Sequence, residues 1–185
     1  MRIIGGIHSG KTIHVSKGMD VRPTTDFAKE GLFNILNNKV DFEGLEVLDL
    51  FSGTGNIAFE FASRGATVTS LDKNFECSRF ISNTAKSLNL NIHTLKGDVF
   101  KFLKTHTQKY DLIFADPPYI LTNIPEIHEW VFQNNLLKEG AWLIIEHGPT
   151  TKLNELPHFF EQRKYGNVNF SFFTNVTSSE VETSK

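Results

Sequence analysis

The amino-acid sequence predicts an α/β fold, with a mainly parallel β-sheet, helices on both of its faces and an antiparallel hairpin at the C-terminal end. Two observations predict it. From Glu46 onward, short apolar runs of strand type alternate with segments of helical period, which is typical of a parallel sheet. After Pro157 the alternation stops, and two strand-like runs follow each other across Gly166 and Asn167, which is typical of a hairpin.

Five apolar runs are the predicted strands of the parallel part of the sheet. They are residues 47–51, 67–71, 91–95, 110–115 and 141–145. The hairpin strands are predicted at 159–165 and 168–174. Apolar stripes that repeat every three or four residues predict three helices between the strands. The stripes are Ile57, Ala58, Phe61 and Ala62; then Cys77, Ile81, Ala85 and Leu88; then Ile124, Ile127 and Val131.

Residues 1–39 differ in kind from this core, and we expect them to form an N-terminal extension. Residues 2–6 and 11–15 are predicted to pair as a small β-hairpin with glycine-rich turns. A helix follows, with Thr24 or Thr25 as its N-cap. Its apolar face is Ala28, Leu32, Ile35 and Leu36. We expect residues 40–177 to form the main domain and residues 178–185, which have little apolar content, to be a disordered tail.

Length and composition exclude several classes of protein. With 185 residues and 39% hydrophobic content, one buried core is expected and a second domain is not. No run approaches the roughly 18 apolar residues of a membrane span, and the first ten residues lack the pattern of a signal peptide, so we expect a cytoplasmic protein. The single cysteine, Cys77, rules out an internal disulfide, and the scattered histidines predict no metal site.

Charge is distributed unevenly, although the net charge is only -2. Residues 1–39 hold six Lys and Arg against three Asp and Glu, which is +3, so the remainder carries -5. A basic arm on an acidic body is a weak form of the footprint of a nucleic-acid binder, and it is equally compatible with a solvated surface. The candidate nucleic-acid contacts in the arm are Arg2, Lys11, Arg22, Thr24 and Lys29.

A glycine-rich motif at residues 49–56 stands where the first core strand turns into its helix. Glycines let the backbone approach a ligand, and open sheets bind ligands beyond the carboxyl ends of their strands. The stretch from Gly53 to Ala58 also fits a dinucleotide-binding pattern, so a nicotinamide-dependent oxidoreductase stays open. Asp49, an acid ahead of the glycines, favours a cationic amino-acid group instead. It therefore favours S-adenosylmethionine, which has an ammonium, a sulfonium and a ribose but no phosphate.

Acids also end the next two predicted strands. Asp72 is placed to accept hydrogen bonds from the ribose hydroxyls, and Asp98 from the adenine amino group, with Val99 offering backbone and apolar contact. Capping a helix is the alternative for each acid, but three acids at three successive strand ends favour a binding site. The predicted cofactor contacts are Asp49, Phe51, Gly53, Thr54, Gly55, Asn56, Asp72, Lys73, Asp98 and Val99.

The segment Asp116-Pro117-Pro118-Tyr119 follows the fourth predicted strand, which neighbours the first in a doubly wound sheet. An exocyclic amine on a nucleic-acid base is a poor nucleophile because its lone pair is delocalised into the ring. Hydrogen bonds from that amine to Asp116 and to a proline carbonyl would favour lone-pair character and aim the nitrogen at a methyl carbon. Tyr119 would stack on an unpaired or flipped base. A plain turn is the alternative for an isolated proline pair.

Two further polar pairs have ordinary structural interpretations. Glu60 and Arg64, one turn apart on the first core helix, are expected to form a surface ion pair. Glu146 and His147, at the end of the fifth strand, either border the pocket or form a satisfied polar pair, which is the interpretation we favour.

Taken together, these residues resemble the RsmD group of 16S ribosomal RNA guanine-N2 methyltransferases, from Arg2 to about Phe173. The glycine loop and the Asp-Pro-Pro-Tyr segment identify a superfamily of amino methyltransferases, and two N-terminal motifs pick out this group. The matching parts are residues 2–6 with Gly10 and Lys11, residues 22–26 with Glu30 and 32–34, residues 49–60 with 63–65, residues 116–119, and Tyr165 with Gly166.

The resemblance implies a class I, Rossmann-like methyltransferase fold with S-adenosylmethionine as cofactor. It implies that the substrate is the N2 amine of a guanine in 16S rRNA, of the kind at position 966, met in the assembled small ribosomal subunit. We expect a monomer. The resemblance also implies that residues 1–39 are an RNA-contacting extension. Where the family usually has two arginines in the N-terminal helix, this chain has Phe27 and Lys29, so its arm is less basic.

Other functions stay open on the sequence alone. A DNA adenine or cytosine amino methyltransferase would use the same Asp-Pro-Pro-Tyr chemistry, but 185 residues leave little room for a target-recognition region. A small-molecule methyltransferase would need a lid over its pocket, whereas the N-terminal arm has the character of a contact surface.

Overall fold

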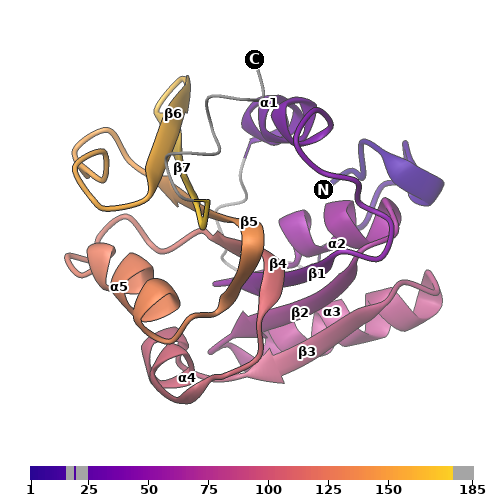
Figure 1. Ribbon diagram of the computed structural model, residues 1–185. Helices are drawn as coiled ribbons and strands as arrows, with labels where there is room; N and C mark the ends of the chain where they lie inside the picture. Colours follow the sequence, from indigo (N-terminus) through magenta and orange to yellow (C-terminus); the bar gives the residue numbers. More distant parts are fainter. Residues whose placement is uncertain (16–18, 20–24, 177–185) are drawn as a thin grey trace.

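The computed structural model describes residues 1–15, 19 and 25–176 of the chain (Figure 1). Within them, one seven-stranded sheet has the order β3-β2-β1-β4-β5-β7-β6. The first five strands in the chain are parallel, and β7 runs antiparallel to both β5 and β6. The predicted mainly parallel sheet with a C-terminal hairpin is therefore confirmed. The strands are β1 (Glu46–Leu50), β2 (Thr67–Asp72), β3 (Ile92–Lys96), β4 (Tyr110–Ala115), β5 (Leu137–His147), β6 (Phe159–Tyr165) and β7 (Val168–Thr174).

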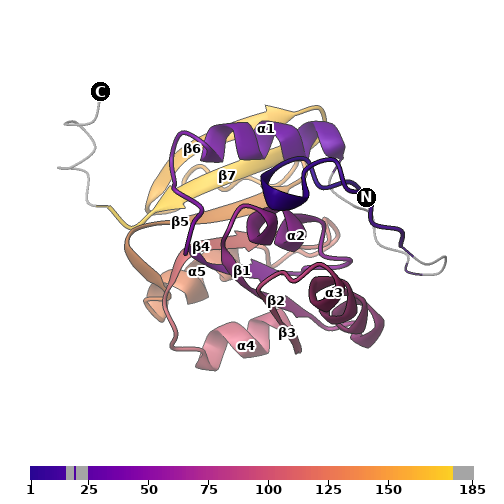
Figure 2. The ribbon, with the colours of Figure 1, turned by 90° about the vertical axis from the view of Figure 1, so that its right-hand side faces the viewer.

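Helices cover both faces of the sheet (Figures 1 and 2). One face carries α1 (Asp26–Leu36), α2 (Asn56–Ser63) and α3 (Phe75–Ser87), whose apolar side chains share one core cluster with Phe114 and Phe170. The other face carries α4 (Val99–Thr105) and α5 (Pro125–Gln133), packed on Leu48 and Ile113. The sequence did not predict α4, because seven residues are too few to establish a helical period.

The strand order reverses between β1 and β4. From β1 the chain passes outward through β2 to β3, and it then returns to place β4 on the other side of β1. The loops that leave the carboxyl ends of β1 and β4 therefore part in opposite directions and leave a crevice, which is where open α/β sheets bind ligands. Both motifs singled out in the sequence, residues 49–56 and 116–119, follow these two strand ends.

The N-terminal segment is less regular than expected. Instead of a β-hairpin, a single bridge joins Arg2 to Thr12, and a short 3-10 turn, Gly6–His8, stands between the two paired stretches. Backbone hydrogen bonds cross the segment, where Ile3 donates to the Lys11 carbonyl at 2.9 Å and Ile13 to the Met1 carbonyl at 2.8 Å, and others tie it to α2. Ile4 donates its N–H to Glu60 at 2.6 Å, and His8 donates its N–H to the Ser63 hydroxyl at 3.0 Å. The predicted hairpin was therefore wrong in extent.

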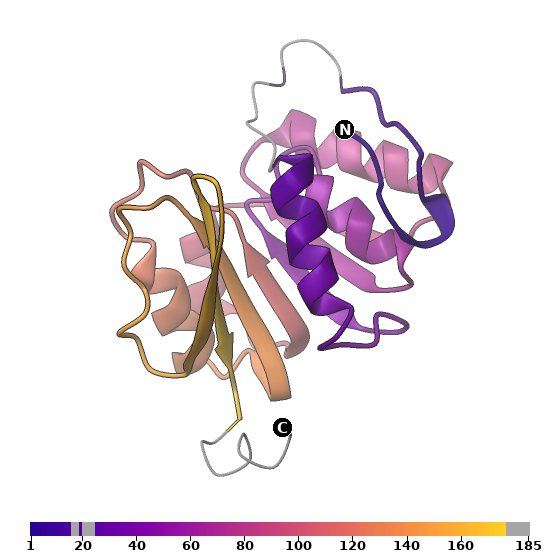
Figure 3. The same cartoon turned by 90° about the horizontal axis from the view of Figure 1, so that it is seen from above.

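Helix α1 connects the N-terminal segment to both halves of the sheet (Figure 3). It begins at its N-cap Thr25, whose hydroxyl accepts the N–H of Ala28 at 3.2 Å, one of the two predicted caps; the other, Thr24, lies outside the described residues. Towards the hairpin, Phe27 meets the edge of the Tyr165 ring, and a Cβ at Gly31 would collide with that same ring. The contact with β6 therefore requires a residue without a side chain at position 31.

Lys29 lies in the core, which overturns its assignment as an RNA contact. Its side chain is 1% exposed, and its ammonium donates to the carbonyl of Arg2 at 2.6 Å and to Oδ1 of Asn56 at 2.8 Å. A carboxylate oxygen of Glu60 lies 3.2 Å away. A lysine with these contacts presents no charge to a phosphate. It fastens the N-terminal segment and α1 to the start of α2.

The pair formed by Glu60 and Arg64 is likewise buried, so the expected surface ion pair was wrong. Glu60 is fully buried, and only 11% of the Arg64 side chain is exposed. The N-terminal segment covers the pair, and the Arg64 guanidinium lies 4.3 Å from the centre of the Phe33 ring. Glu60 thus serves two cations, Lys29 and Arg64, from the middle of α2.

Among the described residues, no helix combines the length and the apolar content that crossing a membrane requires.

Replacing Lys29 by methionine keeps the apolar stem and removes the ammonium. We expect the free energy of unfolding to fall by about 3 kcal/mol, the lower end for breaking a buried ion pair, because Glu60 retains Arg64. Urea denaturation followed by circular dichroism measures the change. The control is Arg79→Met, which removes an exposed pair with Glu76 and should cost less than about 1 kcal/mol. Equal losses of unfolding free energy in the two variants would show that the buried ammonium stabilises the fold no more than an exposed ion pair does.

Candidate active site

Acidic side chains gather where β1, β4 and β5 end. Asp49 pairs in register with Phe114, and Phe114 pairs with Ile144. Side chains of paired residues on parallel strands point to the same face, and successive residues alternate. Asp116 and Glu146, each two residues further on, therefore lie on the same side as Asp49, the side covered by α1 and α2.

Asp49 is a buried carboxyl group with an unmet hydrogen-bonding capacity. It is 1% exposed, and its Oδ2 has no hydrogen-bond partner in the described part of the chain. Burial raises its pKa to about 8, helped by the negative charge of Asp72 and opposed by a hydrogen bond from Ser52. A cation brought to this oxygen would restore the ionised form. The residue present fits the ammonium group of an amino-acid ligand.

The loop between Asp49 and α2 is a tight turn that depends on unusual backbone angles. Gly53 and Gly55 have φ angles of 51° and 83°, and Phe51 has φ 61°, which is rare for a residue with a side chain. The Gly55 N–H donates to the Ser52 carbonyl at 2.8 Å, and a Cβ at Gly55 would press on Ile81 and Phe59. Thr54, between the two glycines, is buried. The loop is preformed in the shape that brings backbone close to a ligand.

Asp72, at the end of β2, holds this loop in place. One carboxylate oxygen accepts the N–H of Gly53 at 2.8 Å, and the other accepts the N–H of Asn74 at 2.8 Å. Each carboxylate oxygen has two acceptor sites, so hydroxyl donors from a ribose remain compatible with both bonds. Lys73, the next residue, is exposed to solvent.

Three other predicted cofactor contacts, Asp98, Val99 and Asn56, have structural roles. Asp98 is the N-cap of α4, where its Oδ1 accepts the N–H of Lys101 at 3.0 Å, the alternative foreseen for it. Val99 packs into the core, so its side chain has little surface to offer a ligand. The amide oxygen of Asn56 is directed to Lys29, which makes Asn56 a link between the glycine loop and the core.

Two aromatic residues beside these acids were not predicted from the sequence to belong to the site. Phe75 opens α3 and is 55% exposed, with the ammonium of Lys96 5.6 Å from the centre of its ring. Phe100 follows Val99, and its ring meets that of Phe51 edge to face at 6.2 Å. Each stands two or three residues after an acid at a strand end, which was the signal available in the sequence. Aromatic faces at this edge suit a flat purine ring.

The Asp116-Pro-Pro-Tyr119 segment forms the other wall of the crevice. Asp116 continues the pairing of β4 with β1 by donating its N–H to the Leu50 carbonyl at 3.3 Å, and a turn closes as Leu121 donates to the Pro118 carbonyl at 2.9 Å. Pro117 is buried and Pro118 is exposed. The loop thus leaves β4 beside the glycine motif, and its conformation is restricted by two fixed proline φ angles.

Tyr119 is anchored by Glu146, for which the sequence favoured a satisfied polar pair over a place at the border of the pocket. Its hydroxyl donates to Oε1 of Glu146 at 2.9 Å, and Glu146 is 3% exposed. The ring lies so close to Gly148 that a Cβ there would be 3.1 Å from Cδ2 of the ring. Tyr119 itself is 36% exposed, so one part of the ring is held and another is open to solvent.

His147, in contrast, is the satisfied polar residue that we expected. Its Nδ1 lies 2.9 Å from the Gly148 carbonyl and must donate there, because a carbonyl only accepts. Its Nε2 lies 2.8 Å from the Ser171 hydroxyl on β7. Burial lowers its pKa, so the neutral ring is favoured. We assign it no chemistry.

Of the predicted nucleic-acid contacts that the structure describes, Arg2 and Lys11 are exposed, and they lie together because Arg2 bridges to Thr12. Arg2 also pairs with Glu30 at 3.4 Å. Arg22 and Thr24 lie outside the described residues, and Lys29 is buried.

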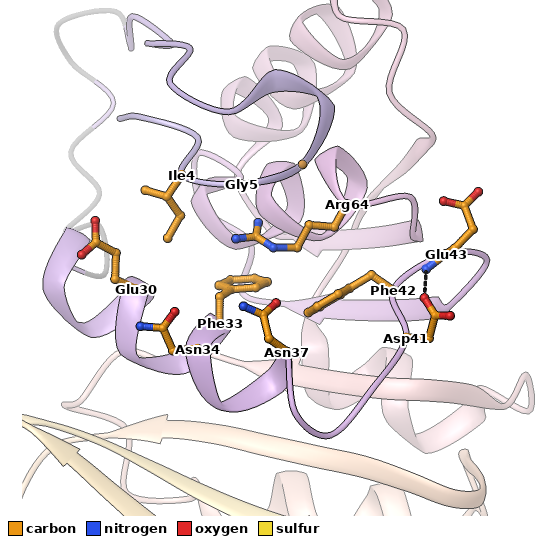
Figure 4. Close-up of a pocket in the computed structure, with 11 residues that line it drawn as sticks. Ile4, Gly5, Glu30, Phe33, Asn34, Asn37, Asp41, Phe42, Glu43 and Arg64 are labelled. Atoms are coloured by element: carbon orange, nitrogen blue, oxygen red, sulfur yellow. Dashed lines mark hydrogen bonds between the residues drawn. The ribbon is translucent and has the colours of Figure 1, made fainter.

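A cavity of about 680 Å³ lies at the opposite end of β1 from these motifs (Figure 4). The N-terminal segment, α1 and the loop before β1 surround it, with Arg64 in its wall. Glu30, Asp41 and Glu43 also line it, so a phosphate there would meet more negative than positive charge. We do not assign it to the cofactor or to RNA.

Comparison with known proteins finds relatives both by sequence and by structure. The family model "Conserved hypothetical protein 95" matches residues 1–174. The chain is 29% identical to "Ribosomal RNA small subunit methyltransferase D" of Buchnera aphidicola subsp. Baizongia pistaciae, over 96% of this chain and 93% of the relative. It is 31% identical to the protein of that name in Escherichia coli K12, over 79% and 71%. The solved "Putative methyltransferase yhhF from Escherichia coli" superposes with a TM-score of 0.82 at 25% identity, over 94% and 97% of the two chains.

The raised pKa of Asp49 predicts a pH dependence of cofactor binding. Burial favours the neutral acid, whereas a bound ammonium requires the carboxylate, so binding releases a proton. Affinity for S-adenosylhomocysteine should therefore rise with pH up to about 8 and then level off; well below that pH the slope approaches about tenfold per pH unit. Isothermal titration calorimetry in buffers of different ionisation heat measures both the affinity and the proton release. In Asp49→Asn the affinity should be weak and nearly independent of pH. An equally steep profile in that variant would assign the dependence to another group.

Proposed function

The chain belongs to the ribosomal RNA small subunit methyltransferase D family, and from this premise we propose that it methylates the exocyclic N2 of a guanine in 16S rRNA. It is an rRNA methyltransferase that uses S-adenosylmethionine; the proposal concerns the acceptor atom, the base and the substrate particle. One observation carries it: the Asp116-Pro-Pro-Tyr119 segment lies across the strand-order reversal from the glycine loop and Asp49.

The residues of the glycine motif would hold the cofactor at its charged end. Asp49 offers its buried carboxylate to the ammonium, and the loop from Gly53 to Gly55 lets the backbone come close. Asp72 would accept from the ribose hydroxyls, and the rings of Phe75 and Phe100 would offer apolar faces to the purine. When bound, S-adenosylmethionine supplies a methyl carbon whose bond to sulfur breaks as its bond to nitrogen forms, with the electron pair staying on sulfur.

Asp116 and the proline segment would prepare the amine. An acceptor at Asp116 and a second at the Pro117 carbonyl take the two N–H groups, which leaves the nitrogen lone pair directed at the methyl carbon. As positive charge develops on nitrogen, the aspartate stabilises it and is placed to accept the proton that the amine must lose. The fixed proline backbone keeps the second acceptor at its position.

Tyr119 would hold the base itself. Stacking on its partly exposed ring requires a base that is unpaired or swung out of its helix. The contacts with Glu146 and Gly148 fix the ring before the base arrives, so little ordering remains to be done on binding.

Arg2 and Lys11 are the described residues that we propose for phosphate contact. They are adjacent and exposed on the N-terminal segment, which α1 and α2 hold against the main domain. We propose the small ribosomal subunit as the substrate particle, because the family is named for it.

The function is tested by mapping 16S rRNA from cells with and without the gene. Mass spectrometry of nuclease fragments should show one guanine that carries a methyl group only when the gene is present, and digestion to nucleosides should identify it as N2-methylguanosine. A methyl group on another atom or base would contradict the proposal.

Asp116→Ala should separate catalysis from cofactor binding. We expect the rate of methyl transfer to fall on the order of 100-fold to 1000-fold, because one preorganised contact to the developing charge is lost. Affinity for S-adenosylhomocysteine should stay near normal, since Asp116 touches the amine and not the cofactor. Single-turnover transfer of tritium to small subunits from the gene-deleted strain gives the rate, and calorimetry gives the affinity. A rate of methyl transfer near that of the wild type in this variant would contradict the mechanism.

A further inference from the structure

Glu146 is a buried carboxylate beside the reacting groups, and the mechanism described so far uses it only to hold Tyr119. It is 3% exposed and lies near the end of β5, between β4 on one side and β7 on the other. Its backbone pairs in register with Phe170 of β7, so the residue stands in the interior of the sheet. A charged group in such a place has a high desolvation cost unless its oxygens are used.

The register of the sheet sets Glu146 next to Asp116. Ala115 pairs with Ile145, and the following residue on each strand is an acid. Neighbouring strands are about 4.8 Å apart, and the two side chains point to the same face. The carboxyl ends of β4 and β5 therefore present two acceptor groups side by side.

Tyr119 shows which way the Glu146 carboxylate faces. Its hydroxyl bonds to Oε1 of Glu146, so the carboxylate lies at the hydroxyl edge of the ring on which the base would stack. A carboxylate has about four acceptor sites, so it can accept from more than one donor at once. A base stacked on the Tyr119 ring would therefore lie beside both carboxylates, Asp116 and Glu146.

Two neighbouring acceptor groups match guanine better than adenine. On the edge that would enter this site, guanine presents two donors in a row, the N2 amine and N1–H. Adenine presents an amine next to N1, which only accepts, and a carboxylate facing it would be repelled. Enzymes that take a base out of its helix read this edge by hydrogen bonds.

We propose that Glu146 is a specificity-determining residue that accepts the N1–H of guanine while Asp116 accepts from the N2 amine. The inference rests on the proposed function and names the group that selects the base. A base without the N1–H leaves a buried carboxylate against an acceptor atom, which costs about 10-fold to 100-fold in rate or binding.

The test uses 2-aminopurine, which keeps the N2 amine of guanine but has an acceptor at N1. Once mass mapping has located the methylated guanine, small subunits are reconstituted with 16S rRNA that carries either guanine or 2-aminopurine at that position. Single-turnover tritium transfer is measured for the wild-type protein and for Glu146→Gln. The wild type should favour guanine by about 10-fold to 100-fold. The glutamine amide can donate to N1 of 2-aminopurine, so the variant should be slower on guanine and its preference should shrink at least about tenfold.

Tyr119→Phe is the matched control, because it removes the hydroxyl from Glu146 and keeps the ring. If Glu146 served only to hold Tyr119, both variants would lower transfer to the two bases by one common factor. That result, with the preference for guanine unchanged in Glu146→Gln, overturns the inference.

The two proposals can fail separately. If the wild-type protein makes N2-methylguanosine in subunits but Glu146→Gln keeps the full preference for guanine over 2-aminopurine, the inference is wrong and the proposed function stands. If the wild type forms no N2-methylguanosine, the proposed function fails and takes the inference with it. A narrowed preference in Glu146→Gln together with a retained preference in Tyr119→Phe supports both.

Discussion

The ammonium of Lys29 is the interaction on which the rest of the arrangement depends. It binds a carbonyl of the N-terminal segment, the amide of Asn56 at the head of α2 and the carboxylate of Glu60 inside the same helix. The first four residues of the chain, α1 and the glycine loop thus meet at one buried nitrogen. Because Asn56 directly follows Gly55, the fixing of α2 also fixes the end of the loop that faces the cofactor. A charge that looks suited to RNA serves to build the site instead.

The acids at this edge of the sheet differ in their burial and in the groups that they bind. Asp72 and Asp98 are largely committed to backbone N–H groups, one supporting the glycine loop and the other capping α4. Asp49 keeps an oxygen without a partner in the described residues, and Glu146 holds a tyrosine ring. Asp72 and Asp98, which support the loops, are more exposed than Asp49 and Glu146, which are buried, where an electrostatic contact is strongest. Under the proposed function Asp72 has two roles, since it supports the glycine loop and also accepts from the ribose.

Much of the fold could be predicted because each strand and most helices carry their own period. The sheet order also follows, since a chain of alternating strands and helices with one final hairpin has few arrangements open to it. Lys29 was misjudged on charge alone, although it stands three, four and seven residues before Leu32, Phe33 and Leu36, the spacing of a buried stripe. The contact between Tyr119 and Glu146 was beyond reach, because 27 residues separate its members and only the pairing of β4 with β5 unites them.

Helix α1 packs on two parts of the molecule: its N-terminal half meets Tyr165 of the hairpin, while Leu32, Phe33 and Leu36 join the core cluster that α2 also contributes to. The segment that looked like an appendage in the sequence is therefore a strap across the sheet. A chain that began at residue 40 would uncover apolar surface on the central strands and on the hairpin together. Such a fragment should be prone to aggregation, because residues 1–39 and the rest of the described chain share one core.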